Sequence, residues 1–178
     1  EILIDGLSQS QVQPKGGMVF QNGLRALLRQ DPDVLVVGEI RDGETAQIAV
    51  RAALTGHVVF TTLHAPSAVE AAVRLSDMGV PAYLAADALT GIVSQRLVRR
   101  KTASGDYEGR FCLCEVVPAG PCFKDALRRR VDLPSLTAAA EGDGAVLLPA
   151  VIQRALDSGL TDEAELRRVC EGGRGLWT

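Results

Sequence analysis

Residues 35–42 of the chain read LVVGEIRD, and the change from apolar to charged residues within this stretch indicates the fold. Together with Val34 it gives the run VLVV, which is typical of a strand buried on both faces of a parallel sheet. Glu39 follows at the carboxyl end of that strand, the edge at which wound α/β sheets bind ligands. A carboxylate there can hold a magnesium-bound water, or remove its proton during attack on a γ-phosphate.

A second apolar run, HVVFTTLH at 57–64, predicts a neighbouring strand because β-branched residues dominate it. It would bring Thr61, Thr62 and His64 to the same edge of the sheet as Glu39. Hydroxyl and imidazole groups can donate hydrogen bonds to a phosphate or orient a water. Two adjacent strands that end in Glu and His therefore predict a nucleotide site more specifically than either strand alone.

The same residues also have a purely structural interpretation. Glu39 could form a surface ion pair with Arg41 or Arg51, and the local sequence favours neither this interpretation nor the catalytic one. His57 could cap or pack against a helix end, which is the simpler interpretation of that residue without further context. Asp42 is expected to be the N-cap of the next helix in any case.

The rest of the first hundred residues alternates between strand-like and helix-like segments, as in a wound α/β sheet. Residues 1–13 predict a strand, a turn at Asp5-Gly6 and a second short strand. Pro32 ends a preceding helix, since the residue before a proline is disfavoured in the α region. The helices predicted up to residue 100 are 18–30, 42–56, 65–79 and 81–100.

From about residue 101 the sequence changes in character. Residues 101–109 are polar and contain glycine, which predicts a loop or hairpin, and RFCLCEVVP at 110–118 predicts one more strand. Short helices are expected at 122–130, 133–141, 148–159 and 162–171, the last with Thr161 as its N-cap. We therefore predict two domains, an α/β core over 1–120 and a small, mainly helical C-terminal subdomain over 121–178.

Composition excludes several other classes of protein. The 178 residues carry a formal net charge of −3 and have no basic stripe interleaved with aromatic residues, which argues against direct contact with nucleic acid. No apolar run approaches the roughly 18 residues of a membrane span, and no secretory signal is visible. Because residue 1 is Glu rather than Met, we expect that the natural N-terminus is missing or processed.

The four cysteines are Cys112, Cys114, Cys122 and Cys170. Their spacing lacks the paired C-x2-C of a zinc ribbon, so no metal site is predicted. Three of them are near enough in sequence for a soft-metal site to be conceivable. Reduced, partly buried thiols are the simpler interpretation.

From about residue 1 to residue 170 the chain resembles the type II secretion and type IV pilus assembly ATPases. DVLVVGEIRD at 33–42 resembles the family's Walker B box, and TGHVVFTTLH at 55–64 resembles its histidine box. IVSQRLVRR at 92–100 is similar to the helix that follows these boxes, and GRFCLCEVVP and GLTDEAELRRV resemble the C-terminal region. The resemblance implies a RecA-like P-loop NTPase core that is truncated and lacks the P-loop.

The resemblance also implies roles for individual residues. Glu39 corresponds to the Walker B glutamate, the base or water-positioning group, and His64 to the histidine that senses the γ-phosphate. His57, Thr62 and Arg41 are expected to lie at the nucleotide with them. Glu1 resembles the last acidic residue of the family's aspartate box.

ATP and Mg²⁺ are the cofactors that the resemblance implies for the full-length protein, and no zinc is expected because the family's cysteine pairs are absent. The expected assembly is a homo-hexamer on the cytoplasmic face of the bacterial inner membrane, docked on a platform protein of a secretion or pilus machine. GEIRD and QRLVRR favour the secretion and pilus-extension branches over retraction. These motifs fit secretion, pilus and DNA-uptake machines equally.

A P-loop requires G-x4-G-K-[ST], and none of the three lysines, Lys15, Lys101 and Lys124, lies in such a motif. In the family that loop precedes the aspartate box, so we expect this chain to be the C-terminal part of a larger ATPase and to be inactive alone. Two alternatives remain open at this stage. One is a non-catalytic ring-interaction module, and the other is a DNA-translocating motor with a similar core.

Overall fold

The computed structural model describes residues 3–11 and 19–170 of the chain. Its first helix is α1 (Phe20–Leu27), which one 3-10 turn, η2 (Leu28–Gln30), extends to the predicted end. Asp31 closes the helix in the left-handed conformation with a φ of 53°. Among these described residues no helix is long and apolar enough to cross a bilayer.

A parallel β-α-β unit follows, and it confirms the α/β class. Strands β1 (Val34–Val37) and β2 (Val58–Thr61) pair in parallel, with helix α2 (Gly43–Leu54) as the connection between them. Asp42 is the N-cap of α2, as predicted, since its carboxylate accepts a hydrogen bond from the N–H of Thr45 at 2.8 Å. The cap fixes the direction in which the chain leaves the end of β1.

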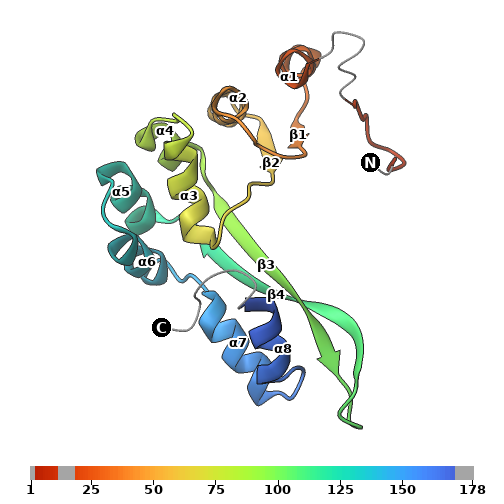
Figure 1. Ribbon diagram of the computed structural model, residues 1–178. Coiled ribbons are helices and arrows are strands. Elements are labelled where there is room, and N and C mark those ends of the chain that lie inside the picture. Colours follow the sequence, from red (N-terminus) through yellow and green to blue (C-terminus); the bar gives the residue numbers. More distant parts are fainter. Residues whose placement is uncertain (1–2, 12–18, 171–178) are drawn as a thin grey trace.

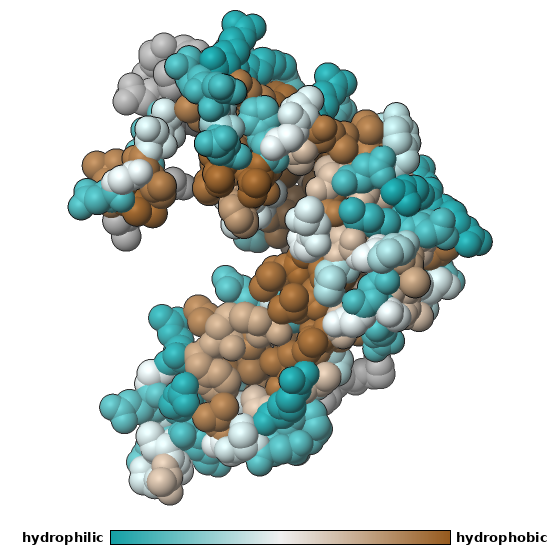
Figure 2. Space-filling view, turned by 180° about the vertical axis from the view of Figure 1, so that it is seen from behind, coloured by the Kyte–Doolittle hydropathy of each residue, from teal (hydrophilic) through white to brown (hydrophobic). Residues whose placement is uncertain are grey.

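The two faces of this strand pair differ in burial. Leu35 and Val37 are 5% and 2% exposed, whereas Val34 and Val36 on the other face are 53% and 67% exposed. Phe60, the neighbour of Val36 on β2, is 61% exposed. The prediction that this strand is buried on both faces is therefore wrong for the described residues, because helices pack against one face only. Figure 2 shows hydrophobic residues gathered in a band on the surface of the molecule.

Helices α3 (Ala68–Asp77) and α4 (Ala82–Ala88) come next. Ser67 is the N-cap of α3, with its hydroxyl oxygen accepting from the N–H of Glu70 at 3.2 Å. The prediction of a helix at 65–79 is thus confirmed over its central part. The prediction of a helix over 81–100 holds only as far as Ala88.

Residues 92–100 are a strand and not a helix, which corrects both the pattern-based prediction and the expected match to a helix of the family. They lie in β3 (Gly91–Lys101), which pairs antiparallel with β4 (Tyr107–Pro118) through a connection at the predicted hairpin. Side chains alternate between more and less exposed from Gly91 to Val98. This alternation in burial, together with the β-branched residues Ile92, Val93 and Val98, fits a pleated, half-buried ribbon better than a helix.

The N-terminal residues 3–11 contain a turn and no strand. The turn at Asp5-Gly6 is as predicted, with a φ of 84° at Gly6 and a hydrogen bond from the N–H of Leu7 to the carbonyl of Ile4. Leu3 is 83% exposed, and no described strand pairs with this segment. Without a hydrogen-bonding partner the alternating pattern does not produce a strand.

Four short helices complete the part of the chain that the structure describes, close to the predicted positions: α5 (Pro121–Arg129), α6 (Leu133–Gly142), α7 (Leu148–Asp157) and α8 (Glu163–Cys170). The N-cap of α8 is Asp162, whose carboxylate accepts from the N–H of Glu165 at 3.0 Å. Thr161, the predicted cap, is instead buried and donates its hydroxyl hydrogen to the carbonyl of Arg99 at 3.2 Å.

Side chains of the described residues pack into two hydrophobic clusters. Figure 1 shows helices α7 and α8 beside the β3–β4 ribbon. The larger cluster joins β1 and helices α1 to α6 with the end of β4, and Phe123 of α5 is fully buried in it. The smaller lies where α7 and α8 cover the β3–β4 ribbon; its buried members are Val98, Leu113, Leu148, Ile152, Ala155 and Leu166. The division into domains at residue 120 stays a prediction. The ribbon connects the two clusters and therefore links α8 to the β1–β2 sheet.

Candidate active site

Glu39 and His64 meet at the carboxyl ends of the two parallel strands. The Nε2 atom of His64 lies 3.1 Å from Oε1 of Glu39. Two hydrogen bonds hold the segments together: the N–H of Ile40 donates to the carbonyl of Thr62 at 2.9 Å, and the hydroxyl of Thr62 donates to the carbonyl of Gly38 at 2.6 Å. The pairing of β1 with β2 thus brings the carboxylate and the imidazole together, as the sequence predicts.

Arg41 contacts the other oxygen of the same carboxylate. Its Nε and Nη2 atoms both lie 2.6 Å from Oε2 of Glu39. The side chain of Glu39 is 21% exposed, whereas those of Arg41 and His64 are 80% and 91% exposed. The ion pair that the sequence offered as a structural alternative is therefore present, and it occurs together with the Glu39–His64 contact rather than in place of it.

Thr62 is also at this edge, but its hydroxyl hydrogen is engaged by the carbonyl of Gly38. Its oxygen retains lone pairs that can accept a hydrogen bond. In this arrangement Thr62 can orient a water by accepting a hydrogen bond from it. Donating to a phosphate, as the sequence suggested, would first require that hydrogen bond to break.

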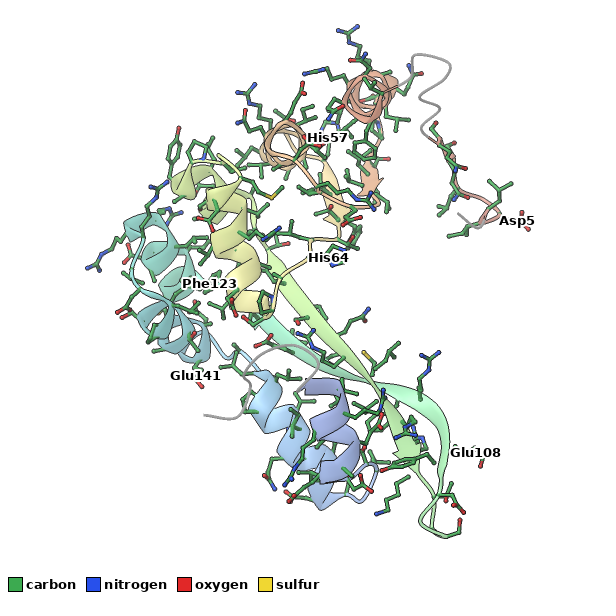
Figure 3. All side chains as sticks on the ribbon, in the orientation of Figure 1. Asp5, His57, His64, Glu108, Phe123 and Glu141 are labelled. Carbon is green, nitrogen blue, oxygen red and sulfur yellow. The ribbon has the colours of Figure 1, made fainter. Side chains whose placement is uncertain are left out.

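His57 lies at the opposite end of β2 from His64 (Figure 3). Its Nδ1 atom is 3.0 Å from the carbonyl of Ala52 and 3.3 Å from the hydroxyl of Thr55, both at the C-terminal end of α2. This is the geometry of a capping histidine. The structure does not bring His57 to Glu39, and Glu1 lies outside the described residues, so a role for either in nucleotide binding stays a prediction.

Two residues that sequence reasoning missed hold the segment after His64. The Nη2 atom of Arg96 on β3 donates to the carbonyl of Pro66 at 2.5 Å, and Oε2 of Glu115 on β4 accepts from the N–H of Ala68 at 2.8 Å. Glu115 is only 3% exposed and lies at the N-terminus of α3, where a carboxylate is favoured. A glutamate within the apolar strand CLCEVV was a detectable signal, since buried carboxylates are rare unless paired.

The donor set at this edge fits a nucleotide bound through Mg²⁺, although only part of such a site is present. Magnesium is commonly held by one or two carboxylates together with water and substrate phosphates, and Glu39 offers such a carboxylate. Among residues 3–11 and 19–170 no group of three or more His, Cys, Asp or Glu side chains could hold a metal ion without a substrate. The phosphate-cradling G-x4-G-K-[ST] motif is absent from the 178 residues.

Comparison with known proteins gives consistent matches. A family profile described as "Type II/IV secretion system protein" matches residues 1–168. The protein transport protein HofB homolog of Escherichia coli K12 is 40% identical over 201 residues, which cover 95% of this chain and 44% of that protein. The type II secretion system protein E of Pseudomonas aeruginosa is 56% identical over 131 residues, covering 72% of this chain and 26% of its own length. The chain thus spans less than half the length of the curated relatives it matches.

Solved structures show the same fold. The pilus retraction motor PilT with bound ADP superposes with a TM-score of 0.74 at 29% identity, covering 89% of this chain and 44% of that one. The Legionella pneumophila ATPase DotB superposes with a TM-score of 0.70 at 27% identity, covering 87% and 43%. The first is described as a pilus retraction motor with bound ADP and the second as an ATPase.

Proposed function

The chain belongs to the type II/IV secretion system protein family, and from this premise we propose that it is the C-terminal portion of the ATPase domain of a secretion or pilus-assembly motor. Membership of an ATPase family supports nucleotide hydrolysis by the full-length protein. The observation that supports a catalytic role for this portion is the 3.1 Å contact between Glu39 and His64 at the carboxyl edge of the sheet.

We infer the following chemistry for these side chains when ATP and Mg²⁺ supply the γ-phosphate. Glu39 accepts one proton of the attacking water, or orients that water, and the Thr62 oxygen can accept a hydrogen bond from the water's other O–H. Nε2 of His64 lies 3.1 Å from Oε1 of Glu39 in the structure, and in our proposal the imidazole would turn to donate to a phosphate oxygen. That exchange frees Oε1 of Glu39 for the water, so the Glu39–His64 contact acts as a resting state that the γ-phosphate relieves.

Arg41 would act in the same exchange. It contacts Oε2 of Glu39 and orients the carboxylate, while its guanidinium is exposed enough to reach a phosphate. The roles of Glu1 and His57 as further nucleotide contacts remain part of the proposal. In our proposal the phosphate-cradling loop and the aspartate box are contributed by sequence upstream of residue 1, and the isolated 178 residues do not turn over ATP.

The exposed apolar face of the β1–β2 pair supports a larger folded unit. Val34, Val36, Val58 and Phe60 are each more than half exposed on it, whereas a wound sheet is covered on both faces. We propose that the full-length protein covers this face and assembles as a homo-hexamer at the cytoplasmic side of the bacterial inner membrane, docked on a platform protein. Direct contact with nucleic acid is not part of the proposal, given the net charge of −3.

The test is a carboxylate-to-amide change in the natural full-length protein. Glu39→Gln should lower the turnover number for ATP by about 10²-fold or more while ATP affinity changes only a few-fold. Glu44→Gln is the matched control, since Glu44 pairs with Arg25 on the outside of α2. Unchanged turnover in Glu39→Gln would reject the catalytic role, and a natural protein of only 18.9 kDa would favour a non-catalytic interaction module instead.

A further inference from the structure

Two thiols on β4 lie in contact with each other. The Sγ atoms of Cys112 and Cys114 are 3.4 Å apart, and both residues are exposed. They project from the same side of the strand because they are two residues apart. Cys122 lies on α5, so it does not join them, and the described residues supply no third metal ligand.

The ribbon fixes this pair in position. Cys112 lies opposite Leu97 and Cys114 lies opposite Gln95 in the antiparallel register. The thiol of Cys112 is also within 3.6 Å of Oε1 of Gln95. Val93, Leu97 and Val116 on the same face are 63%, 52% and 42% exposed, so the two sulfurs are framed by apolar side chains that face solvent. A ligand can therefore reach both sulfurs without any rearrangement of the ribbon.

The sulfur–sulfur distance discriminates between kinds of thiophilic centre. With thiolate bonds of about 2.3 Å, a linear two-coordinate centre needs sulfurs about 4.6 Å apart, and a tetrahedral one needs about 3.8 Å. A pyramidal centre with bond angles near 90° needs about 3.3 Å at the same bond length. The observed 3.4 Å fits the pyramidal case, and a tetrahedral centre would also require two more ligands.

We propose that Cys112 and Cys114 form a dithiol site for trivalent arsenicals, in particular those that carry an apolar substituent. An arsonous acid RAs(OH)2 would react with the two thiols to form two As–S bonds and release two molecules of water, with no change in oxidation state. The R group occupies the third position of the pyramid and packs on Val93, Leu97 and Val116. The proposal concerns the β3–β4 ribbon and does not depend on the proposed ATPase function.

The test uses phenylarsonous acid, the hydrated form of phenylarsine oxide, with the 178-residue chain. One phenylarsenic group should bind per chain, resist an excess of a monothiol and be removed by 2,3-dimercaptopropanol. Because chelation links the two bonds, Cys112→Ser and Cys114→Ser should each weaken binding by about 10²-fold or more. Cys122→Ser and Cys170→Ser are the matched controls and should bind as the unaltered chain does.

Arsenic K-edge absorption provides the second readout. Two sulfur neighbours per arsenic are expected in the unaltered chain, and one or none in either strand variant. Circular dichroism would establish that the serine variants remain folded. Full binding by Cys112→Ser or Cys114→Ser, or loss of binding in Cys122→Ser or Cys170→Ser, would overturn the proposal.

Discussion

Glu165 on α8 accepts hydrogen bonds from both the backbone and the side chain of Arg99 on β3. Its Oε1 accepts from the Arg99 N–H at 2.8 Å, and its Oε2 accepts from Nε of Arg99 at 2.7 Å. Arg168 adds two further hydrogen bonds at 2.6 and 2.8 Å. Glu165 is fully buried, so this one carboxylate joins the last helix of the described chain to the ribbon.

Removing this carboxylate should loosen α8. Glu165→Ala leaves the guanidinium and the partly buried backbone N–H of Arg99 without their acceptor, at a cost of about 2–4 kcal/mol in the free energy of unfolding. Glu163→Ala is the matched control on the same helix, since Glu163 makes only a solvent-exposed pair with Arg167. Urea denaturation measures both. Equal midpoints for the two variants would contradict a structural role for Glu165.

The same contacts predict an acid-sensitive stability. Arg168 and Arg99 hold the pKa of Glu165 well below its usual range, and hydrogen bonds led by that of Tyr107 lower the pKa of Asp162 to about 2. A lowered pKa in the folded state stabilises the protein above the unfolded value of about 4, and the benefit is lost as pH falls toward the folded value. The midpoint temperature of thermal unfolding should therefore decrease when the pH is lowered below about 4. This decrease should be smaller in Glu165→Gln than in the unaltered chain.

Tyr107 provides a spectroscopic check on this network. Its hydroxyl donates to Oδ1 of Asp162 at 2.7 Å, and this hydrogen bond raises the pKa of Tyr107. Asp162→Asn should bring the pKa of Tyr107 down, toward an ordinary tyrosine. Phenolate absorbance can follow it, since Tyr83 is the one other tyrosine in the sequence and can be replaced by Phe. An identical titration in Asp162→Asn would show that the hydrogen bond does not form in solution.

Glu115 should act as a positioning residue for the segment that follows His64. Glu115→Ala removes the acceptor of the Ala68 N–H, at a cost of about 1–3 kcal/mol, and should speed amide hydrogen exchange at residues 67–70. Glu115→Gln keeps an acceptor oxygen and should restore most of the protection. The two histidines give distinguishable NMR signals, and His64 should shift in Glu115→Ala while His57 does not. A shift of both signals would indicate general unfolding instead.

The carboxyl-edge site could be predicted from sequence because short-range patterns determine it. A β-branched run that ends in Glu39 and another that ends in His64 define adjacent strands, and parallel pairing alone then brings the two side chains together. The N-cap at Asp42 likewise depends only on residues close to it in the sequence. These features depend on a few consecutive residues and on the general behaviour of parallel sheets.

The incorrect predictions concern segments whose secondary structure depends on residues far away in the sequence. Residues 92–100 contain Leu, Gln and Arg, which are good helix formers, yet they form β3 because β4 offers a partner along its length. The two strands expected in residues 1–13 have no such partner among the described residues 3–11, which form no strand. Arg96 and Glu115 could be linked to His64 only after this ribbon had been placed.

The last prediction concerns the exposed apolar face of the β1–β2 pair. Val36 and Phe60 are register neighbours, 67% and 61% exposed, and an apolar sheet face of this kind promotes association. The isolated chain should therefore self-associate at micromolar concentration in sedimentation velocity, and Phe60→Ser should shift it toward monomer with little loss of stability. Val37→Ser, on the buried face, should instead destabilise the fold by about 1–3 kcal/mol.

In the full-length protein Phe60→Ser should have a different effect, because we propose that the apolar face of the β1–β2 pair is covered there. Phe60→Ser would then remove a buried contact and lower the thermal midpoint, whereas in the isolated chain it changes only association. A midpoint that is unaffected in the full-length protein would mean that the face stays open to solvent. The contrast between the two contexts thus tests whether the β1–β2 sheet continues into a larger core.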